Sequence, residues 1–149
     1  FVQIEDWSGR IEASFFRDAF VEFGPLLTRD ALLVIEGGLS FDDFSNAHQL
    51  RARSVLTLEQ ACERFARSIR VALNGVGPAF VDSLRSALAA YRGGQTPLRL
   101  SYASAAGKAD LDLGPEWRVR AGPDLMRALH GLPGVKSAEL LLTRANSAN

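Results

Sequence analysis

Residues 1–16 read FVQIEDWSGRIEASFF, and this stretch decides the fold of the first part of the chain. Apolar residues alternate with polar ones on both sides of Asp6-Trp7-Ser8-Gly9, as they do in half-buried β-strands. Those four residues carry turn chemistry, and Gly9 suits a left-handed backbone because it has no Cβ. The segment therefore predicts a β-hairpin that turns at Asp6–Gly9.

A short helix and two further strands are predicted behind this hairpin. Apolar side chains recur at helical spacing over residues 18–27, until Gly24 and Pro25 interrupt the pattern. An apolar run at 31–37 and an alternating segment at 49–56 flank a predicted loop. The order strand, strand, helix, strand, strand matches an oligonucleotide-binding (OB) fold without its first strand. We expect an incomplete OB barrel over residues 1–56, with one unpaired sheet edge.

The rest of the chain predicts a small α+β domain. Thr57 and Gln60 have capping-box spacing, so a connecting helix is expected over residues 57–68. The patterns that follow predict strand, helix, three strands, helix and strand, which is typical of helices packed on one mixed sheet. We expect this domain to cover residues 69–144 and a tail to cover 145–149. The predicted fold class is thus mixed β and α+β.

Composition excludes several classes of protein. The 149 residues are 47% hydrophobic with a net charge of +0, which is ordinary for a soluble globular chain and excludes disordered and fibrous classes. No apolar stretch is long enough for a membrane helix, so a cytoplasmic location without membrane contact is expected. The only methionine is Met126 and Phe1 already lies within a predicted strand, so we expect a piece of a longer protein.

Charge is divided unevenly along the chain. Residues 1–60 carry ten carboxylates against five arginines, whereas 61–149 carry seven carboxylates against twelve basic groups. Arg51 and Arg53 are two apart on a predicted strand, so both face one side and are candidates for phosphate contact. Phe41 and Phe44 flank two aspartates in the neighbouring loop and are candidates for base stacking. A solvated strand face and rings that pin the loop to its own core are the plainer alternatives.

The end of the chain supplies a candidate surface for a partner. Leu140 and Leu142 share one side of a predicted strand and Leu141 takes the other, so something should cover them. Lys136 and Arg144 add positive charge, which suits an acidic partner or DNA, and a generic basic surface is the alternative.

No catalytic or metal-binding residue is predicted within this chain. Asp110 and Asp112 place two carboxylates on one strand face, as a two-metal site requires, but no third carboxylate accompanies them. His48, His130 and Cys62 stand without ligand spacing to one another. A magnesium-dependent nuclease is kept as an enzymatic alternative, and a solvated hairpin face is the more economical interpretation of the two aspartates.

Several motifs resemble one known family. The Asp6–Gly9 turn, the sequence SFDDFS at 40–45 and the ending ARSV at 52–55 resemble the OB domain of the bacterial DNA polymerase III alpha subunit. Downstream, EQACERFARSI at 59–69, RSALAAYRGGQTPLRLSY at 85–102 and GPEWRV at 114–119 resemble the C-terminal domain of that family. The resemblance runs in order along nearly the whole chain.

The resemblance implies a non-catalytic part of a DNA-directed DNA polymerase. In that family the magnesium-binding catalytic aspartates lie far upstream, so no cofactor is expected here. The OB domain is associated with single-stranded template DNA, and the C-terminal domain with the tau subunit of the clamp loader. The implied partners are therefore single-stranded DNA, tau and the rest of the polymerase chain, within the bacterial replisome. A second alternative is an OB-type module that binds folded RNA.

Overall fold

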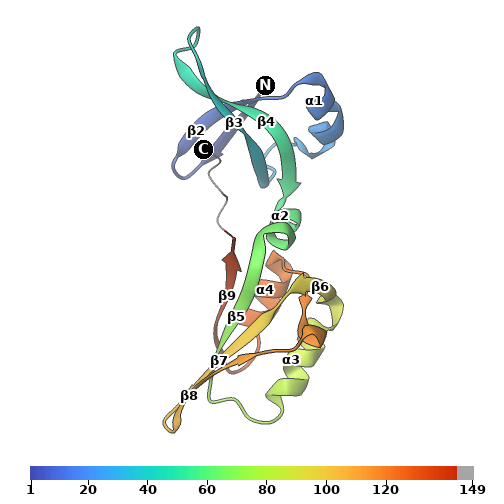
Figure 1. Ribbon diagram of the computed structural model, residues 1–149, viewed down its shortest axis with the longest axis vertical. Helices are drawn as coiled ribbons and strands as arrows, with labels where there is room; N and C mark the ends of the chain where they lie inside the picture. Colours follow the sequence, from blue (N-terminus) through green and yellow to red (C-terminus); the bar gives the residue numbers. More distant parts are fainter. Residues whose placement is uncertain (144–149) are drawn as a thin grey trace. The chain divides into compact units, whose positions relative to one another are not determined.

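The computed structural model describes residues 1–143, and the chain divides into two compact units, Phe1–Leu58 and Glu59–Asn149 (Figure 1). Within the described residues each unit contains one four-stranded sheet that mixes parallel and antiparallel pairs. The predicted mixed β and α+β fold class is confirmed. No helix in the described part of the chain is long and apolar enough to cross a membrane.

The first unit begins with the predicted hairpin. Its elements are β1 (Val2–Asp6), β2 (Gly9–Ser14), α1 (Arg17–Phe23), the 3₁₀ turn η1 (Gly24–Leu26), β3 (Leu33–Asp42) and β4 (Ala47–Thr57). Strands β1 and β2 pair antiparallel with Ile4 opposite Ile11. The left-handed backbone expected at Gly9 is wrong, because Gly9 is absent from the glycines with positive φ. Instead, the Asp6 carboxylate accepts bonds from the backbone N–H groups of Ser8 and Gly9, which closes the turn.

The sheet of the first unit has the order β1-β2-β4-β3. Strands β2 and β4 are parallel over a short ladder from Glu12 opposite Gln49 to Ser14 opposite Arg51. Each of these two strands directly follows its hairpin turn, so both turns lie at the same end of the sheet. Figure 1 shows the two hairpins splaying apart toward the left.

A β-bulge interrupts the long β3–β4 hairpin. Glu36 lies opposite Ser54 but Gly37 lies opposite Ala52, which leaves Arg53 as the extra residue of β4. A Cβ on Gly37 would overlap the carbonyl oxygen of Arg51, so only glycine fits this close approach. The bulge therefore depends on a single residue without a side chain.

The core of the first unit is small. Its fully buried apolar residues are Ala13, Ala52 and Val55. Helix α1 has no buried residue. The large apolar side chains that remain exposed in this unit are Phe1, Trp7, Phe16, Phe20, Val21, Leu32, Leu39, Phe41 and Phe44.

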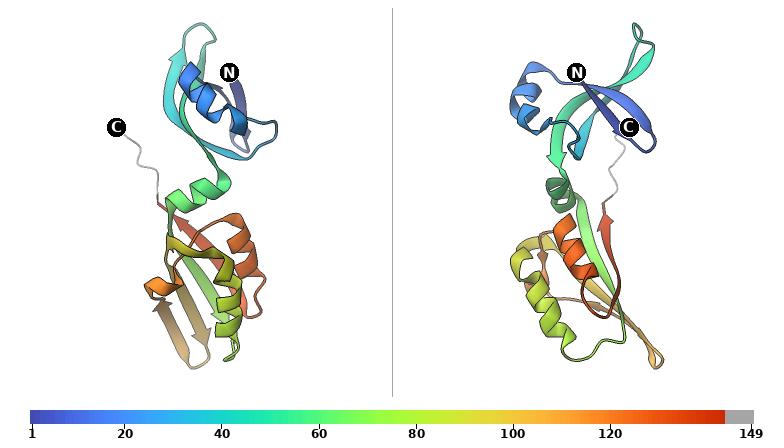
Figure 2. Two further views of the ribbon diagram at one scale, coloured as in Figure 1. Left: turned by 90° about the vertical axis from the view of Figure 1, so that its right-hand side faces the viewer. Right: turned by 180° about the vertical axis from the view of Figure 1, so that it is seen from behind.

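The second unit is an α+β sandwich. Its elements are α2 (Leu58–Phe65), which starts at the boundary, β5 (Ala66–Asn74), α3 (Phe80–Leu88), η2 (Ala89–Tyr91), β6 (Arg92–Thr96), β7 (Leu98–Ser104), β8 (Gly107–Asp112), η3 (Pro115–Trp117), α4 (Pro123–His130) and β9 (Val135–Leu142). The sheet order is β8-β7-β5-β9. Helices α3 and α4 lie on the same face of the sheet, as Figure 2 shows. The strand predicted near Trp117 is a 3₁₀ turn, followed by isolated bridges from Val119 to Arg92 and Thr96.

The core of this second unit lies between the sheet and its two long helices. Ile69, Val71 and Leu73 alternate along β5 toward this core, where α4 contributes Leu125 and Leu129. Burying side chains of this size stabilises a fold by about 1.5–3 kcal/mol each. The opposite face of the same sheet carries polar side chains and is not covered by the helices (Figure 2).

Candidate nucleic-acid interface and partner-binding surface

The predicted phosphate contacts, Arg51 and Arg53, are both exposed on β4. The Arg51 guanidinium carbon lies 5.1 Å from the centroid of the Phe16 ring, a cation–π contact. The Arg53 guanidinium lies beside Gly38, which is the residue opposite Arg51 in the sheet. Stacking engages the flat face of a guanidinium and leaves its N–H edge available, so this pair has the chemistry to bind phosphate.

The two candidate stacking rings, Phe41 and Phe44, occupy different surroundings. Phe41 lies on β3, where its ring packs edge-to-face on His48 of β4 with centroids 5.3 Å apart. Phe44 lies in the turn between β3 and β4 and is 99% exposed. Phe41 is thus already engaged in a cross-strand contact, and Phe44 presents its ring to solvent.

The carboxylate of Asp42 fixes the turn that carries Phe44. It accepts hydrogen bonds from the Ser45 hydroxyl at 2.6 Å, the Ser45 backbone N–H at 3.2 Å and the Phe44 backbone N–H at 3.4 Å. These bonds favour the charged form and hold the pKa of Asp42 below its usual value, with the Ser45 hydroxyl as the main cause. The turn therefore has a defined backbone although its side chains are exposed.

The β1–β2 turn has the same construction around Trp7. The Asp6 carboxylate accepts bonds from the Ser8 hydroxyl at 2.6 Å, the Ser8 N–H at 2.7 Å and the Gly9 N–H at 3.0 Å, and these lower the pKa of Asp6. Trp7 is 98% exposed. Trp7 is absent from the predicted site residues. The sequence did contain a signal for Trp7. At both hairpins an aromatic residue lies between an aspartate that caps the turn and a serine.

A second candidate surface lies on the uncovered sheet face of the other unit. Glu139, Arg70, Arg99 and Asp112 form one row across the four strands. Arg99 donates from Nε to Asp112 at 2.6 Å and from Nη2 at 3.0 Å. This bidentate pair lowers the pKa of Asp112 chiefly through its hydrogen bond. Arg70 is exposed beside this pair.

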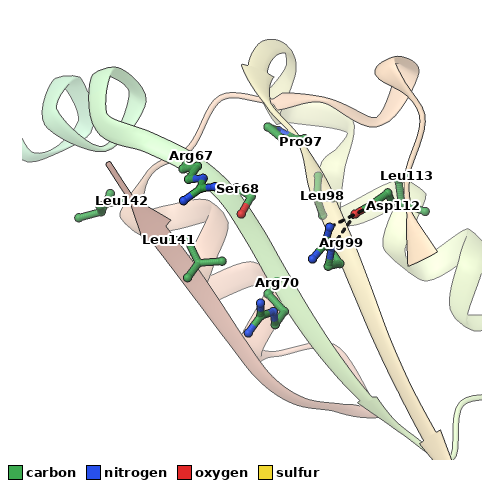
Figure 3. Close-up of a pocket in the computed structure, with 10 residues that line it drawn as sticks. All are labelled: Arg67, Ser68, Arg70, Pro97, Leu98, Arg99, Asp112, Leu113, Leu141 and Leu142. Carbon is green, nitrogen blue, oxygen red and sulfur yellow. Dashed lines mark hydrogen bonds and ion pairs between the residues drawn. The ribbon is translucent and has the colours of Figure 1, made fainter. Parts of the chain in front are cut away.

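A shallow hollow of about 500 Å³ adjoins that row (Figure 3). It combines the arginines Arg67, Arg70 and Arg99 with the apolar side chains of Leu141 and Leu142. Figure 3 shows these groups projecting from β5, β7 and β9. Apolar contact and positive charge are thus adjacent, a combination that suits an acidic partner with apolar anchors.

The predicted partner-binding residues do not all share this hollow. Leu142 lines it and is 55% exposed, but Leu140 packs against the core on the helix side. The predicted pair Leu140 and Leu142 thus lies in two different surroundings, and Leu142 is the last residue of β9. Lys136 lines a separate hollow with Asp110. Arg144 lies outside the described residues.

The aspartates considered for catalysis are both engaged by side chains of β7. Asp110 accepts a bond from the Ser101 hydroxyl at 2.6 Å, and Asp112 pairs with Arg99. Within residues 1–143 there is no group of three or more histidine, cysteine, aspartate or glutamate side chains placed to hold a metal ion. Burial raises the pKa of the Cys62 thiol. The two aspartates thus act as cross-strand partners in the β7–β8 hairpin.

Comparison with known proteins yields a consistent set of relatives. The family model described as DNA polymerase III subunit alpha, C-terminal domain, matches residues 83–134. DNA polymerase III subunit alpha of Pseudomonas aeruginosa is 42% identical over 136 residues, which are 87% of this chain and 11% of the relative. The same subunit of Escherichia coli K12 is 35% identical over 139 residues, which are 92% of this chain and 12% of the relative. The chain thus spans about 12% of the length of the relatives it matches.

Proposed function

Because this chain is homologous to the C-terminal region of DNA polymerase III subunit alpha, we propose that it serves DNA replication as a non-catalytic part of such a polymerase. The first unit contacts single-stranded template DNA, and the second docks the tau subunit of the clamp loader. Its location is then the replisome in the bacterial cytoplasm. Nucleotide addition with magnesium is assigned to the rest of the polymerase chain.

Single-stranded DNA binding rests mainly on the adjacent arginines of β4. Arg51 and Arg53 are both exposed on β4, and Arg51 stacks on the Phe16 ring. The strand order of the first unit, with β2 parallel to β4, supports its interpretation as an OB-type sheet whose edge strands β1 and β3 would be joined by one further strand. OB folds bind nucleic acid through such a face and its loops.

Tau docking rests on the hollow that Arg67, Arg70, Leu141 and Leu142 line. Its mixture of positive charge and apolar surface fits a partner segment that carries acidic and apolar residues. An acidic segment would gain charge-assisted hydrogen bonds from the arginines, since guanidinium groups match carboxylate geometry.

The nuclease alternative and the RNA-binding alternative have less support. A magnesium nuclease would need Asp110 and Asp112 free to hold metal, and both already accept short bonds from β7 side chains. Replacing both aspartates with asparagine would abolish nuclease activity if that alternative held. An RNA-binding module would show higher affinity for structured RNA than for a single DNA strand.

The DNA proposal is tested by titrating the 149-residue chain with a labelled thymidine oligomer at several salt concentrations. Arg53→Ala should weaken binding and reduce the salt slope by about 0.7, the value for one lost contact to a single strand. Arg29→Ala, which changes an exposed arginine outside the strands, is the matched control. An unchanged slope in Arg53→Ala would contradict the phosphate contact.

The tau proposal is best tested by point substitution. Strand β9 pairs with β5 and contributes Ala138 to the core, so deletion from Lys136 onward would disrupt the unit itself. Arg70→Glu should weaken binding to purified tau at least tenfold, since it places a like charge before an acidic segment. Arg118→Glu is the control. Equal binding by both variants would place the docking surface elsewhere.

A further inference from the structure

The two hairpin turns of the first unit share one hydrogen-bonding arrangement. In each, an aspartate accepts bonds from a serine hydroxyl and from backbone N–H groups: Asp6 with Ser8, and Asp42 with Ser45. Each turn holds an aromatic side chain out in solvent, Trp7 at 98% and Phe44 at 99% exposure. A ring held out in solvent on a defined turn is available to stack on a planar ligand such as a nucleobase.

The sheet brings the two turns to one end. Glu12 of β2 and Gln49 of β4 are opposite each other in a parallel ladder. Trp7 and Phe44 stand the same number of residues before that pair. Figure 1 and the right-hand view of Figure 2 show both turns on one side of the unit, with the two hairpins splayed apart. One extended ligand can therefore meet both turns.

The β1–β2 hairpin also offers a place for an apolar group. A shallow hollow of about 350 Å³ is lined by Ile4 and Ile11 together with Asp6, Ser8 and Arg10 of the turn. Its size lies within the range of small-ligand sites. The two isoleucine side chains in its lining suit the flat, weakly hydrated face of a nucleobase.

Charge determines which part of a nucleic acid can approach the turns. Glu5 and Asp6 flank Trp7 on one side, and Asp42 and Asp43 precede Phe44. Glu5 is paired with Arg10 at 2.8 Å, and the three aspartates repel phosphates. Arg51 and Arg53 lie further along β4, beyond the turn. Bases are thus favoured at the turns and phosphates at the arginines.

We propose that Trp7 and Phe44 are two base-stacking residues of one single-stranded DNA site, in which bases contact the hairpin turns and phosphates contact β4. This inference rests on the proposed DNA-binding function of the first unit. It adds Trp7 to the DNA-contacting residues, and it assigns base contacts to the turns and phosphate contacts to β4. An exposed aromatic pair also suits an apolar pocket on a protein, and the experiment separates these cases.

The test uses the intrinsic fluorescence of Trp7. In the 149-residue chain carrying Trp117→Phe, Trp7 is the single tryptophan. This variant is titrated with a thymidine oligomer and with an abasic oligomer of equal length, which has the same phosphates and no bases. The thymidine oligomer should quench the emission and the abasic oligomer should not.

Substitutions supply the second measurement. Trp7→Ala and Phe44→Ala should each weaken binding of the thymidine oligomer by about fivefold or more, as expected for one lost stacking contact. Their salt slopes should stay unchanged, because no phosphate contact is lost. Val21→Ala removes an exposed apolar side chain from α1, away from the two turns, and should leave the affinity unchanged. Circular dichroism verifies that each variant is folded.

Three results would overturn the inference. If Arg53→Ala weakens binding but Trp7→Ala and Phe44→Ala behave like Val21→Ala, stacking is wrong while the proposed DNA function stands. Equal quenching by the abasic oligomer would also exclude stacking. Absence of measurable binding to either oligomer would overturn both proposals, and would favour a protein pocket for the two rings.

Discussion

The two units build sheets of the same size and surround them very differently. In the second unit α3 and α4 cover one face and bury large side chains such as Leu84, Leu88, Leu125 and Leu129. The first unit fully buries only Ala13, Ala52 and Val55 among its apolar residues. Hydrophobic stabilisation scales with the apolar area removed from water, so a sheet without a second layer gains little of it.

This contrast indicates where each unit obtains its structure. The second unit depends on packing between layers. The first depends on local devices: hairpin pairing, two aspartate-capped turns and the glycine bulge at Gly37. Large apolar side chains that stay exposed are available to a ligand or to further chain.

The largest effect is expected from the core of the second unit. Leu125→Ala removes a fully buried side chain of α4 and should lower the free energy of unfolding by about 2–5 kcal/mol. Leu39→Ala in the first unit should change it little, because Leu39 is 70% exposed. Urea unfolding followed by circular dichroism and amide hydrogen exchange measures both. Equal losses would show that the first unit has a core of its own.

A smaller effect is expected at the bulge of the first unit. Gly37→Ala forces a Cβ onto the Arg51 carbonyl and should cost about 1–3 kcal/mol, the range for overpacking. Amide exchange along β3 and β4 should accelerate. Gly9→Ala is the matched control, since nothing lies within 4 Å of a Cβ there. Equal rates of amide exchange in Gly37→Ala and Gly9→Ala would show that the close approach at Gly37 does not limit the residue at this position.

The smallest effect is expected at the capped turns. Because hydrogen bonding lowers the pKa of Asp6 and of Asp42, their contribution to stability is complete above the ordinary carboxyl pKa of about 4 and is lost as pH falls through the lowered value. In Asp6→Asn the pH dependence of stability should disappear at the β1–β2 turn and remain at the β3–β4 turn. NMR shifts of the Ser8 and Ser45 amides against pH measure it. A Ser8 amide that still titrates like the wild type would contradict the cap.

Part of the architecture was predictable because its signals are local. Alternation on both sides of Asp6–Gly9 predicts the first hairpin, and helical spacing predicts α3. Other features depend on contacts between distant residues. The bulge at Arg53 lies where β3 pairs with β4, and Leu140 packs against a core that α3 and α4 complete.

The candidate site was predicted in the same partial way. Arg51, Arg53 and Phe44 follow from residue type and spacing. The contact of Phe41 with His48 and the hydrogen bonds that the aspartates accept at both turns became visible only in three dimensions.

The amino-acid sequence alone determined the first hairpin and helix α3, since hydrophobic periodicity and turn residues act within a few positions of the chain. It did not determine every element, because the strand predicted near Trp117 is a 3₁₀ turn. Only the tertiary structure decided that β2 and β4 run parallel and so carry the Trp7 and Phe44 turns to one end of a sheet. The reason is physical: strand pairing is chosen by the backbone hydrogen bonds and packing of segments far apart in sequence, which no local pattern records.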